Sequence, residues 1–428
     1  MKSDYEIANE NIMSPISAIA AEMNLPAEML VPFGHNKAKI NITEFDEQKI
    51  AKSKLILVTA ITPNKAGVGK TTTSVGLADG LHKLNKKVVL ALREPSLGPC
   101  FGMKGGAAGG GFSQVVPMED INLHFTGDFH AITAANNTLS SLIDNYRFYT
   151  RGKPEGVKTV LMKRCLDVND RSLRNIVTAL HGPNNGITTE TGFVITPASE
   201  LMAVLCLSEG LEDLRTKIDD MLLGFTFAGE PFTTKDLGVT GAITALMKDA
   251  ILPNLVQTLE HTPALIHGGP FANIAHGCNS LMATKTAMQF GDYVVTEAGF
   301  ASDLGAEKFF NIKCRKAGLQ PAMSVLVATL QALKLSGGST EADMKQPDLG
   351  KLKEGLRNLQ KHISILKTFG QKVLVVINRH GVDDAKEIEF MRSWCGDNDA
   401  AFAVNDAFSL GGDGAVEMAQ AVIDICEN

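Results

Sequence analysis

The sequence has no long apolar run, no cysteines at metal-binding spacing and no excess of basic residues. Its longest apolar stretches, such as 201–207 and 373–377, are far too short to cross a bilayer. The seven cysteines are scattered and odd in number, and none forms a CxxC pair, which argues against a disulfide framework and against a zinc site. The net charge of −6 leaves no basic face for nucleic acid or anionic lipid. We therefore expect neither a membrane protein nor a nucleic-acid-binding protein.

The N-terminus also lacks the apolar run of a signal peptide, because MKSDYEIANE contains acids at those positions. We therefore expect a cytoplasmic, soluble protein. The length of 428 residues, with 44% hydrophobic and 21% charged residues, fits an ordered chain of two or three domains. No internal repeat, coiled-coil heptad or low-complexity tract is visible.

Short, nearly continuous apolar segments predict buried strands of a parallel sheet. A strand at 54–60, a helix at 71–84 and a strand at 87–92 predict a βαβ unit. Similar strands are predicted at 292–296, 323–328 and 372–377, whereas 155–260 looks mostly helical. We expect an α/β fold with a P-loop and a doubly wound, mostly parallel sheet carrying helical insertions. The predicted domains are a nucleotide-binding domain, with N-terminal helices, over 1–300 and a second, smaller α/β domain over 301–428.

A glycine-containing loop between the first predicted strand and its helix is typical of phosphate binding. Gly67 and Gly69 allow backbone N–H groups to approach phosphate oxygens, Lys70 can bridge terminal phosphates, and the Thr71 hydroxyl can coordinate Mg²⁺. The predicted nucleotide-binding loop consists of Asn64, Lys65, Ala66, Gly67, Val68, Gly69, Lys70 and Thr71. Asn64 replaces the usual first glycine, and this variant is similar to loops of dimeric ATPases that present a lysine, here Lys65, across an interface. The alternative is an ordinary glycine-rich turn with an exposed lysine.

Arg93 follows the second strand of the predicted βαβ unit. Ligands of parallel sheets bind beyond the carboxyl ends of the strands, so we expect Arg93 to face the same crevice as the phosphate loop. A guanidinium there can bind a small carboxylate or neutralise a phosphoryl group during transfer. The glycine-rich segment 102–111 supplies a backbone that can approach a ligand closely. The alternative is a flexible surface loop.

Three weaker signals lie outside these loops. His124, Asp128 and His130 fall in one short segment, predicted as a strand and turn, and are candidate acid–base groups; the alternative is ordinary polar residues at a strand end. Asn378 follows the strand 372–377, at a position from which nucleotide-binding folds often contact the nucleotide base. A glycine turn at 267–276 precedes a helix and is a second candidate anion-binding end, although packing or capping is the default role of its histidines.

Long stretches of the chain resemble the formate–tetrahydrofolate ligase family. The matching stretches are 57–61 with the phosphate loop, 91–98, 102–111, 114–130, 247–260, 267–280 and 297–309. The resemblance implies an ATP-dependent ligase that forms 10-formyltetrahydrofolate from formate and tetrahydrofolate through formyl phosphate. It also implies a P-loop-like core, a homotetramer, and activation by a monovalent cation such as K⁺ or NH₄⁺. By the same resemblance, Arg93 holds formate and formyl phosphate, and Lys70 holds the nucleotide phosphates.

The chain also departs from the pattern of this family. Lys65, Val68, Phe112, Gln331 and Ser336 differ from the usual residues, and the two aromatic positions that enclose the pterin ring carry His380 and Phe408. The family continues through a C-terminal domain beyond the position of Asn428. We therefore expect a divergent member that lacks this domain.

Two other functions fit the same residues. One is a paralogue that activates a small carboxylate as an acyl phosphate and passes it to a non-folate acceptor. The other is an ATP-dependent assembly partner, which the Lys65 loop variant suggests.

Overall fold

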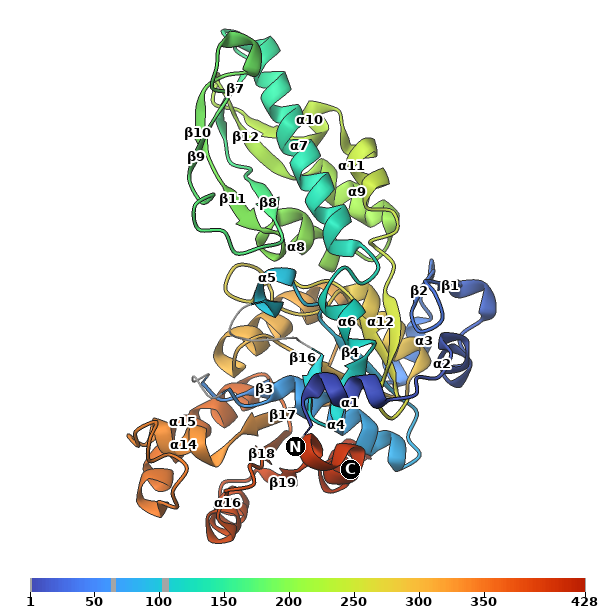
Figure 1. Ribbon diagram of the computed structural model, residues 1–428, viewed down its shortest axis with the longest axis vertical. Helices are drawn as coiled ribbons and strands as arrows, with labels where there is room; N and C mark the ends of the chain where they lie inside the picture. Colours follow the sequence, from blue (N-terminus) through green and yellow to red (C-terminus); the bar gives the residue numbers. More distant parts are fainter. Residues whose placement is uncertain (1, 63–66, 102–107, 428) are drawn as a thin grey trace.

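A large mixed sheet forms the body of the protein in the computed structural model, which describes residues 2–62, 67–101 and 108–427 (Figure 1). The sheet order is β1-β2-β14-β15-β4-β16-β3-β17-β18-β19, with β6 beside β14 and β5 beside β6. Each neighbouring pair from β15 to β19 is parallel. These parallel strands are β15 (Pro263–Ile266), β4 (Val88–Leu92), β16 (Tyr293–Glu297), β3 (Lys54–Ala60), β17 (Met323–Ala328), β18 (Val373–Asn378) and β19 (Ala401–Asn405).

The other end of the sheet is antiparallel and was not predicted from the sequence. It contains β1 (Leu30–Pro32), β2 (Ala38–Ile40), β5 (Gly109–Gly110), β6 (Ser113–Val116) and β14 (Asn254–Thr258). The short β1 and β2 replace part of the helical N-terminus that the sequence predicted. The prediction of a mixed α/β protein with a large, mostly parallel sheet is confirmed.

Helices pack on the sheet strands. Helix α4 (Lys70–Lys83) contacts α18 (Val416–Glu427), α12 (Leu281–Phe290) contacts α3 (Glu47–Lys52), and α15 (Leu349–Thr368) contacts α14 (Leu330–Ser336). Further helices are α1 (Asp4–Glu10), α2 (Ile16–Glu22), α5 (Leu97–Cys100), α6 (Met118–Asn122), α13 (Arg315–Ala317), α16 (Ala385–Asp397) and α17 (Ala407–Leu410), with π-helical turns at Ser302–Ala306 and Phe309–Cys314.

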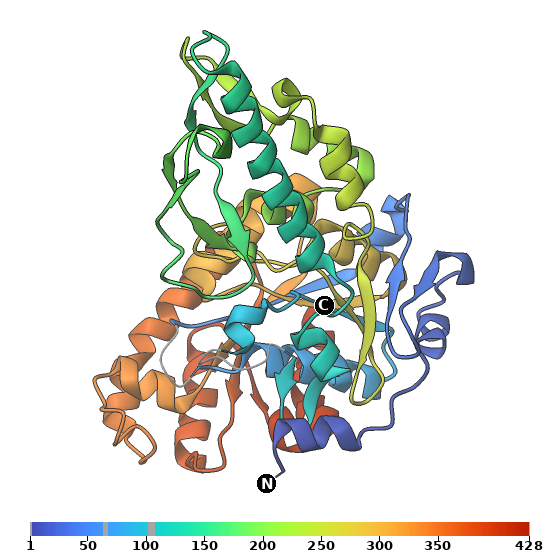
Figure 2. The ribbon, with the colours of Figure 1, turned by 45° about the horizontal axis from the view of Figure 1, so that its top comes forward.

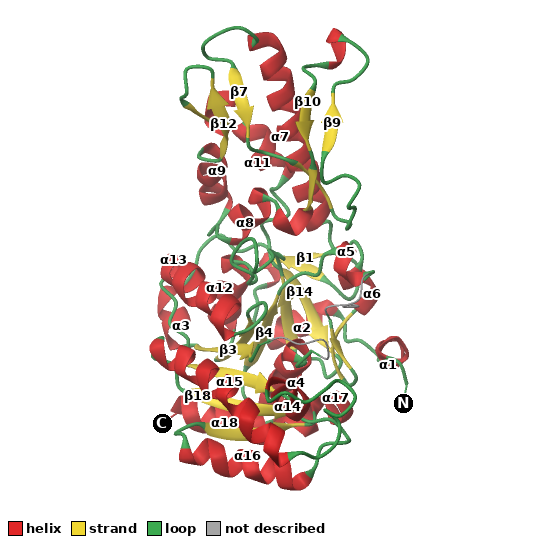
Figure 3. Ribbon diagram, turned by 90° about the vertical axis from the view of Figure 1, so that its left-hand side faces the viewer, coloured by secondary structure: helices red, strands yellow, loops and turns green. Residues whose placement is uncertain are grey.

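A lobe inserted between α6 and β14 projects from the sheet (Figures 1, 2 and 3). Its helices are α7 (Asp128–Thr150), α8 (Glu200–Cys206), α9 (Leu211–Asp219), α10 (Thr234–Leu237) and α11 (Thr240–Leu246). Its strands are β7 (Val157–Val160), β8 (Arg164–Leu166), β9 (Ile176–Thr178), β10 (Thr189–Thr191), β11 (Phe193–Ile195), β12 (Leu222–Thr226) and β13 (Pro231–Thr233). The prediction that 155–260 is mostly helical is therefore wrong for the many short strands in this lobe.

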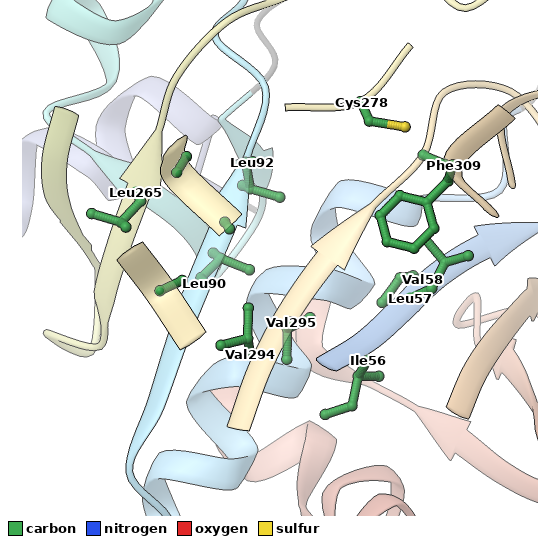
Figure 4. Close-up of a cluster of buried hydrophobic side chains, with 14 of the residues drawn as sticks. Ile56, Leu57, Val58, Leu90, Leu92, Leu265, Cys278, Val294, Val295 and Phe309 are labelled. Carbon is green, nitrogen blue, oxygen red and sulfur yellow. The ribbon is translucent and has the colours of Figure 1, made fainter. Parts of the chain in front are cut away.

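The core lies on the parallel strands, whose side chains are almost all buried (Figure 4). Leu57, Leu90 and Val295 come from three neighbouring strands and are each fully buried. Burial of a leucine or valine side chain contributes roughly 1.5–3 kcal/mol, which explains the nearly continuous apolar sequence of these strands. Strands β17, β18 and β19 continue the sheet beyond residue 300. Both predicted domains therefore contribute strands to one sheet, and their division at residue 300 stays a prediction.

Within the described ranges, no helix combines the length and apolar content needed to cross a membrane.

One buried carboxyl makes the stability of this fold depend on pH. Asp79 on α4 is fully buried, and its Oδ1 accepts hydrogen bonds from Thr258 at 2.6 Å and Thr262 at 2.7 Å. Burial, which outweighs these bonds, raises the pKa of Asp79 to about 7, and Glu260 adds to the increase. An unfolded Asp has a pKa of about 3.9. Because the folded pKa is the higher one, this group's stabilising contribution is complete below about pH 4 and is lost as the pH rises towards 7.

We therefore expect Asp79→Asn to raise the melting temperature at pH 8, because the amide keeps an acceptor oxygen and removes the buried charge. The gain is expected to be on the order of a few kcal/mol at pH 8 and smaller at pH 5. Thermal unfolding at both pH values measures it, with Asp249→Asn, at an exposed ion pair, as the control. If the difference in melting temperature between Asp79→Asn and wild type is the same at both pH values, the buried charge of Asp79 does not cause it.

Candidate functional site

A cleft of about 670 Å³ lies where the ends of β3, β4 and β16 meet. These strands are neighbours in the order β4-β16-β3 and run parallel, so their carboxyl ends open at the same edge of the sheet. The segment after β3 supplies Gly67–Thr72, the segment after β4 supplies Arg93–Ser96, and β16 supplies Glu297. The remaining lining residues are Pro99, Cys100, Gly109, Asn169, Gly269, Phe271, Ala272, Asn273, Gly299 and Phe300.

The described part of the predicted phosphate loop forms one wall of the cleft. Gly67 and Gly69 have φ values of +69° and +72°, which favour glycine. Helix α4 begins at Lys70, immediately after this turn, so its N-terminal N–H groups are available to an anion. Gly67, Val68, Gly69, Lys70 and Thr71 all line the cleft. Asn64, Lys65 and Ala66 lie outside the described residues.

Thr71 and Glu297 bring a hydroxyl and a carboxylate together in the lining of the cleft. The Thr71 hydroxyl donates to Glu297, with Oγ1 at 3.2 Å from Oε1 and 3.0 Å from Oε2. The Glu297 side chain is buried at the end of β16. A hydroxyl and a carboxylate are the oxygen donors that Mg²⁺ prefers. The residues present therefore fit a magnesium ion bound beside nucleotide phosphates.

Arg93 lines the same cleft as the loop, as predicted, and is bonded to one backbone carbonyl. Its Nη1 donates to the carbonyl oxygen of Pro270 at 3.4 Å. Its buried Nε has no hydrogen-bond partner among the described residues, so part of the guanidinium's donor capacity is unused. A Cβ on Gly299 would lie 3.1 Å from Nη1, so the side chain runs closely along this glycine. Arg93 is therefore placed to receive an anion in the cleft.

Glu94 is a buried acid in the same wall. Its Oε2 has no hydrogen-bond partner among the described residues. Burial, followed by the nearby Asp128 carboxylate, raises the pKa of Glu94 well above its usual range. Burial and the Asp128 carboxylate therefore favour the neutral, protonated form of Glu94.

The predicted acid–base residues lie outside the main cleft. His124 and His130 line a separate hollow of about 140 Å³ with Leu97, Leu123, Phe129, Thr133 and Asp167. Asp128 is buried and forms an ion pair with Lys39, whose Nζ lies 2.7 Å from Oδ1. The segment is the end of α6, a turn and the start of α7, so the predicted strand is wrong. The catalytic role of His124, Asp128 and His130 stays a prediction.

The residues predicted to bind nucleotide base or pterin lie at the ends of β18 and β19. Asn378 is buried against the phosphate loop and does not line the cleft. His380 is exposed just after β18, and Phe408 in α17 is 39% exposed. The Phe408 carbonyl accepts a hydrogen bond from the Phe112 N–H at 2.9 Å. Both flat side chains are exposed, and their role stays a prediction.

Sequence reasoning missed Glu297 and Glu94 as site residues. The available signal for Glu297 was an acid directly after a predicted apolar strand, and the signal for Glu94 was its position next to Arg93.

The glycine turn at 267–276 contributes Gly269, Phe271, Ala272 and Asn273 to the cleft. Its histidines are buried, and burial lowers the pKa of His267 to about 4 and that of His276 to about 3. His267 is bonded to Ser280 and Ala250, as expected for a packing role.

The fold defines an α/β protein with a cleft at the carboxyl ends of parallel strands. The family described as "Formate--tetrahydrofolate ligase" matches residues 2–428. The chain belongs to this family, and the predicted family and enzyme class are confirmed.

Curated relatives with the same name are similar over the whole chain. The relative from Bacteroides thetaiotaomicron is 60% identical over 428 residues, and those from Parabacteroides distasonis and Porphyromonas gingivalis are each 58% identical over 428 residues. Each match covers 100% of this chain and 77% of the relative. The expectation of a divergent member that lacks a C-terminal domain is not supported, since the family match extends from residue 2 to residue 428.

Proposed function

We propose that this protein joins formate to tetrahydrofolate at the expense of ATP, forming 10-formyltetrahydrofolate, ADP and phosphate. The observation that carries the proposal is the convergence of the phosphate loop, Arg93 and the Thr71–Glu297 pair on one cleft. Family membership and the names of the close relatives support the same reaction. We take the glycine loop to be a functional P-loop of a doubly wound nucleotide-binding fold.

In the first step, a formate oxygen attacks the γ-phosphorus of ATP, the bond to the bridging oxygen breaks, and ADP leaves. Formate is ionised near neutral pH, as carboxylic acids with a pKa of about 4 are, so no general base is required. Catalysis therefore depends on positioning and on neutralising negative charge. Lys70 and the N-terminus of α4 bind the nucleotide phosphates. The Arg93 guanidinium orients formate and the transferred phosphoryl group, and then holds formyl phosphate.

In the second step, the N10 amine of tetrahydrofolate attacks the formyl carbon, phosphate leaves, and the nitrogen loses a proton. We propose that His380 and Phe408 contact the pterin ring, supported by their exposed flat side chains at adjacent strand ends. His124, Asp128 and His130 are the predicted proton acceptors. A turnover number of His124→Ala/His130→Ala within a few fold of the wild-type value would remove the two histidines from the mechanism.

Two cations belong to the proposal. No group of three or more acidic, histidine or cysteine side chains in the described part of the chain is placed to hold a metal ion. Mg²⁺ held by Thr71 and Glu297 would therefore take further ligands from ATP and water, and when bound it neutralises phosphate charge. We place the monovalent cation, K⁺ or NH₄⁺, beside Glu94, supported by its Oε2 atom in the cleft lining, which has no hydrogen-bond partner among the described residues. Glu94→Gln is expected to remove the activation by K⁺, and retained activation would exclude this residue.

We further propose that the protein is a cytoplasmic homo-oligomer. The support is a set of exposed apolar side chains on the inserted lobe: Tyr149, Leu161, Val168, Val177, Leu180 and Phe227. Exposed apolar side chains grouped on one lobe favour a protein interface. Light scattering is expected to give a multiple of the 45.8 kDa chain mass, and a monomer at micromolar concentration would contradict this.

The decisive experiment measures ADP release and 10-formyltetrahydrofolate with ATP, Mg²⁺, K⁺ and formate, with and without tetrahydrofolate. We expect strong ADP release only when formate and tetrahydrofolate are both present, together with equal amounts of the folate product. Formate-dependent ADP release that does not change when tetrahydrofolate is added would favour a different acceptor for the formyl group. ATP-driven oligomerisation without turnover would favour an assembly partner. Either result would overturn the proposed function.

A further inference from the structure

The backbone carbonyls of the phosphate loop are held by a chain of side-chain hydrogen bonds. Asn378 Nδ2 donates to the carbonyl oxygen of Val68 at 3.2 Å. Asn405 Nδ2 donates to Asn378 Oδ1 at 3.1 Å and to Thr73 Oγ1 at 3.2 Å. The Thr73 hydroxyl donates to the carbonyl oxygen of Gly69 at 2.9 Å. The chain of bonds therefore begins and ends on adjacent residues of the loop.

This chain of bonds is protected from water. Asn378 is 8% exposed, and Asn405 and Thr73 are fully buried. Buried polar groups of this kind need their partners, because an unpaired carbonyl or amide cannot turn to solvent. A Cβ on Gly69 would lie 2.3 Å from Asn378 Nδ2, so the asparagine also packs directly on the loop. The loop conformation and the two asparagines therefore depend on one another.

The two asparagines come from strands that are not adjacent to the strand carrying the loop. The loop follows β3, whereas Asn378 ends β18 and Asn405 ends β19, two and three places further along the sheet. The two strand ends are joined by a second pair, in which Arg379 Nε and Nη2 each lie 2.6 Å from an oxygen of Asp406. Asn405 Oδ1 also accepts the N–H of Ala407 at 3.2 Å. Side-chain bonds therefore join the ends of β18 and β19 to each other, and Asn378 joins them to the loop.

We propose that Asn378 and Asn405 are positioning residues that fix the phosphate loop from the ends of β18 and β19. Asn378 occupies the carbonyl oxygen of Val68, and Asn405 holds the Thr73 hydroxyl that donates to the carbonyl oxygen of Gly69. This turns the loop N–H groups towards the cleft before the nucleotide arrives. The inference rests on the proposed function, because the ligand of the loop is taken to be ATP. It replaces the expectation that Asn378 reads the nucleotide base.

The test is calorimetric titration of the full-length chain with MgADP, which requires neither formate nor folate. We expect Asn378→Ala and Asn405→Ala each to raise the dissociation constant of MgADP about tenfold, which corresponds to about 1.4 kcal/mol. The double variant is expected to be about tenfold weaker as well, because either substitution breaks the same chain of bonds. In steady-state assays the KM for ATP is expected to rise more than the turnover number falls.

The matched control is Asn398→Ala, which removes an asparagine-to-carbonyl bond at the C-terminal end of α16, where Nδ2 donates to the carbonyl oxygen of Trp394 at 2.8 Å. This control is expected to affect melting temperature but not MgADP binding. If Asn378→Ala does not fold, Asn378→Ser keeps a polar group that is too short to reach Val68. Folded variants with wild-type affinity would overturn the inference, as would a hundredfold, additive loss in the double variant.

The outcomes also separate this inference from the proposed function. A wild-type chain that binds MgADP but makes no 10-formyltetrahydrofolate would overturn the proposed function alone, and the tenfold effects would still support the positioning role. A wild-type chain that does not bind MgADP would overturn both.

Discussion

Arg93→Ala is expected to lower the turnover number about a thousandfold while leaving MgADP affinity within a few fold of wild type. Arg93 lines the same cleft as the phosphate loop and keeps unused donor capacity, and under the proposed function its charge acts on formate and the transferred phosphoryl group. Removing one preorganised donor at a developing negative charge costs about 10²–10³ in rate, and an arginine that neutralises a phosphoryl group costs about 10³–10⁵. Steady-state kinetics and calorimetric titration measure the two effects separately.

Two further arginine variants sharpen this test. Arg93→Lys keeps the positive charge but loses the planar fork, so it is expected to recover only part of the turnover. Arg392→Ala removes an exposed arginine that pairs with Glu417 at 3.0 Å, and it is expected to leave turnover unchanged. An Arg93→Ala variant that loses MgADP affinity as strongly as turnover would show that Arg93 binds nucleotide or supports the fold.

Glu297→Gln is expected to raise the Mg²⁺ concentration for half-maximal activity by roughly 10- to 100-fold. The carboxylate lies within hydrogen-bond distance of the Thr71 hydroxyl at the floor of the cleft, where a phosphate-bound Mg²⁺ would be held. The neutral amide keeps the size of the side chain but loses the negative charge that attracts the ion. The Mg²⁺ dependence of ADP release at saturating ATP and formate measures the change.

The hydroxyl of Thr71 provides an independent check on the same site. Thr71→Val is expected to raise the Mg²⁺ requirement, whereas Thr71→Ser keeps the hydroxyl and is expected to behave like wild type. Glu417→Gln, at an exposed glutamate, is the control for a change of overall charge. An unchanged Mg²⁺ dependence in Glu297→Gln would show that this carboxylate does not serve the ion.

The sequence was sufficient to predict the parallel part of the sheet. Strands 54–60 and 323–328 have the same bounds in the structure, because a strand covered on both faces has an almost continuous apolar sequence. The inserted lobe could not be predicted in this way. Its strands are three to five residues long and are mostly only partly buried, so tertiary contacts rather than their own pattern decide their conformation.

The same limit applies to the site. The position of the glycine loop and of Arg93 in the cleft was predictable, because each depends on a short local motif beside a predicted strand. Glu297 was not, because it lies 226 residues from Thr71 in the sequence and reaches it only because β16 is inserted between β3 and β4. Asn378 was placed correctly at a strand end, but its contact with Val68 spans 310 residues and depends on strand order.

The parallel strands from β3 to β19 form one continuous run. The loop proposed to bind ATP, after β3, and the residues proposed to bind the pterin ring, after β18 and β19, are therefore joined by a sheet without a hinge. Neighbouring strands are spaced about 4.8 Å apart, so three steps from β3 to β19 span about 14 Å. Bending this span would require breaking ladder hydrogen bonds between these mostly buried strands. Under the proposed function, the sheet therefore sets the distance between the two substrates when the chain folds rather than when they bind.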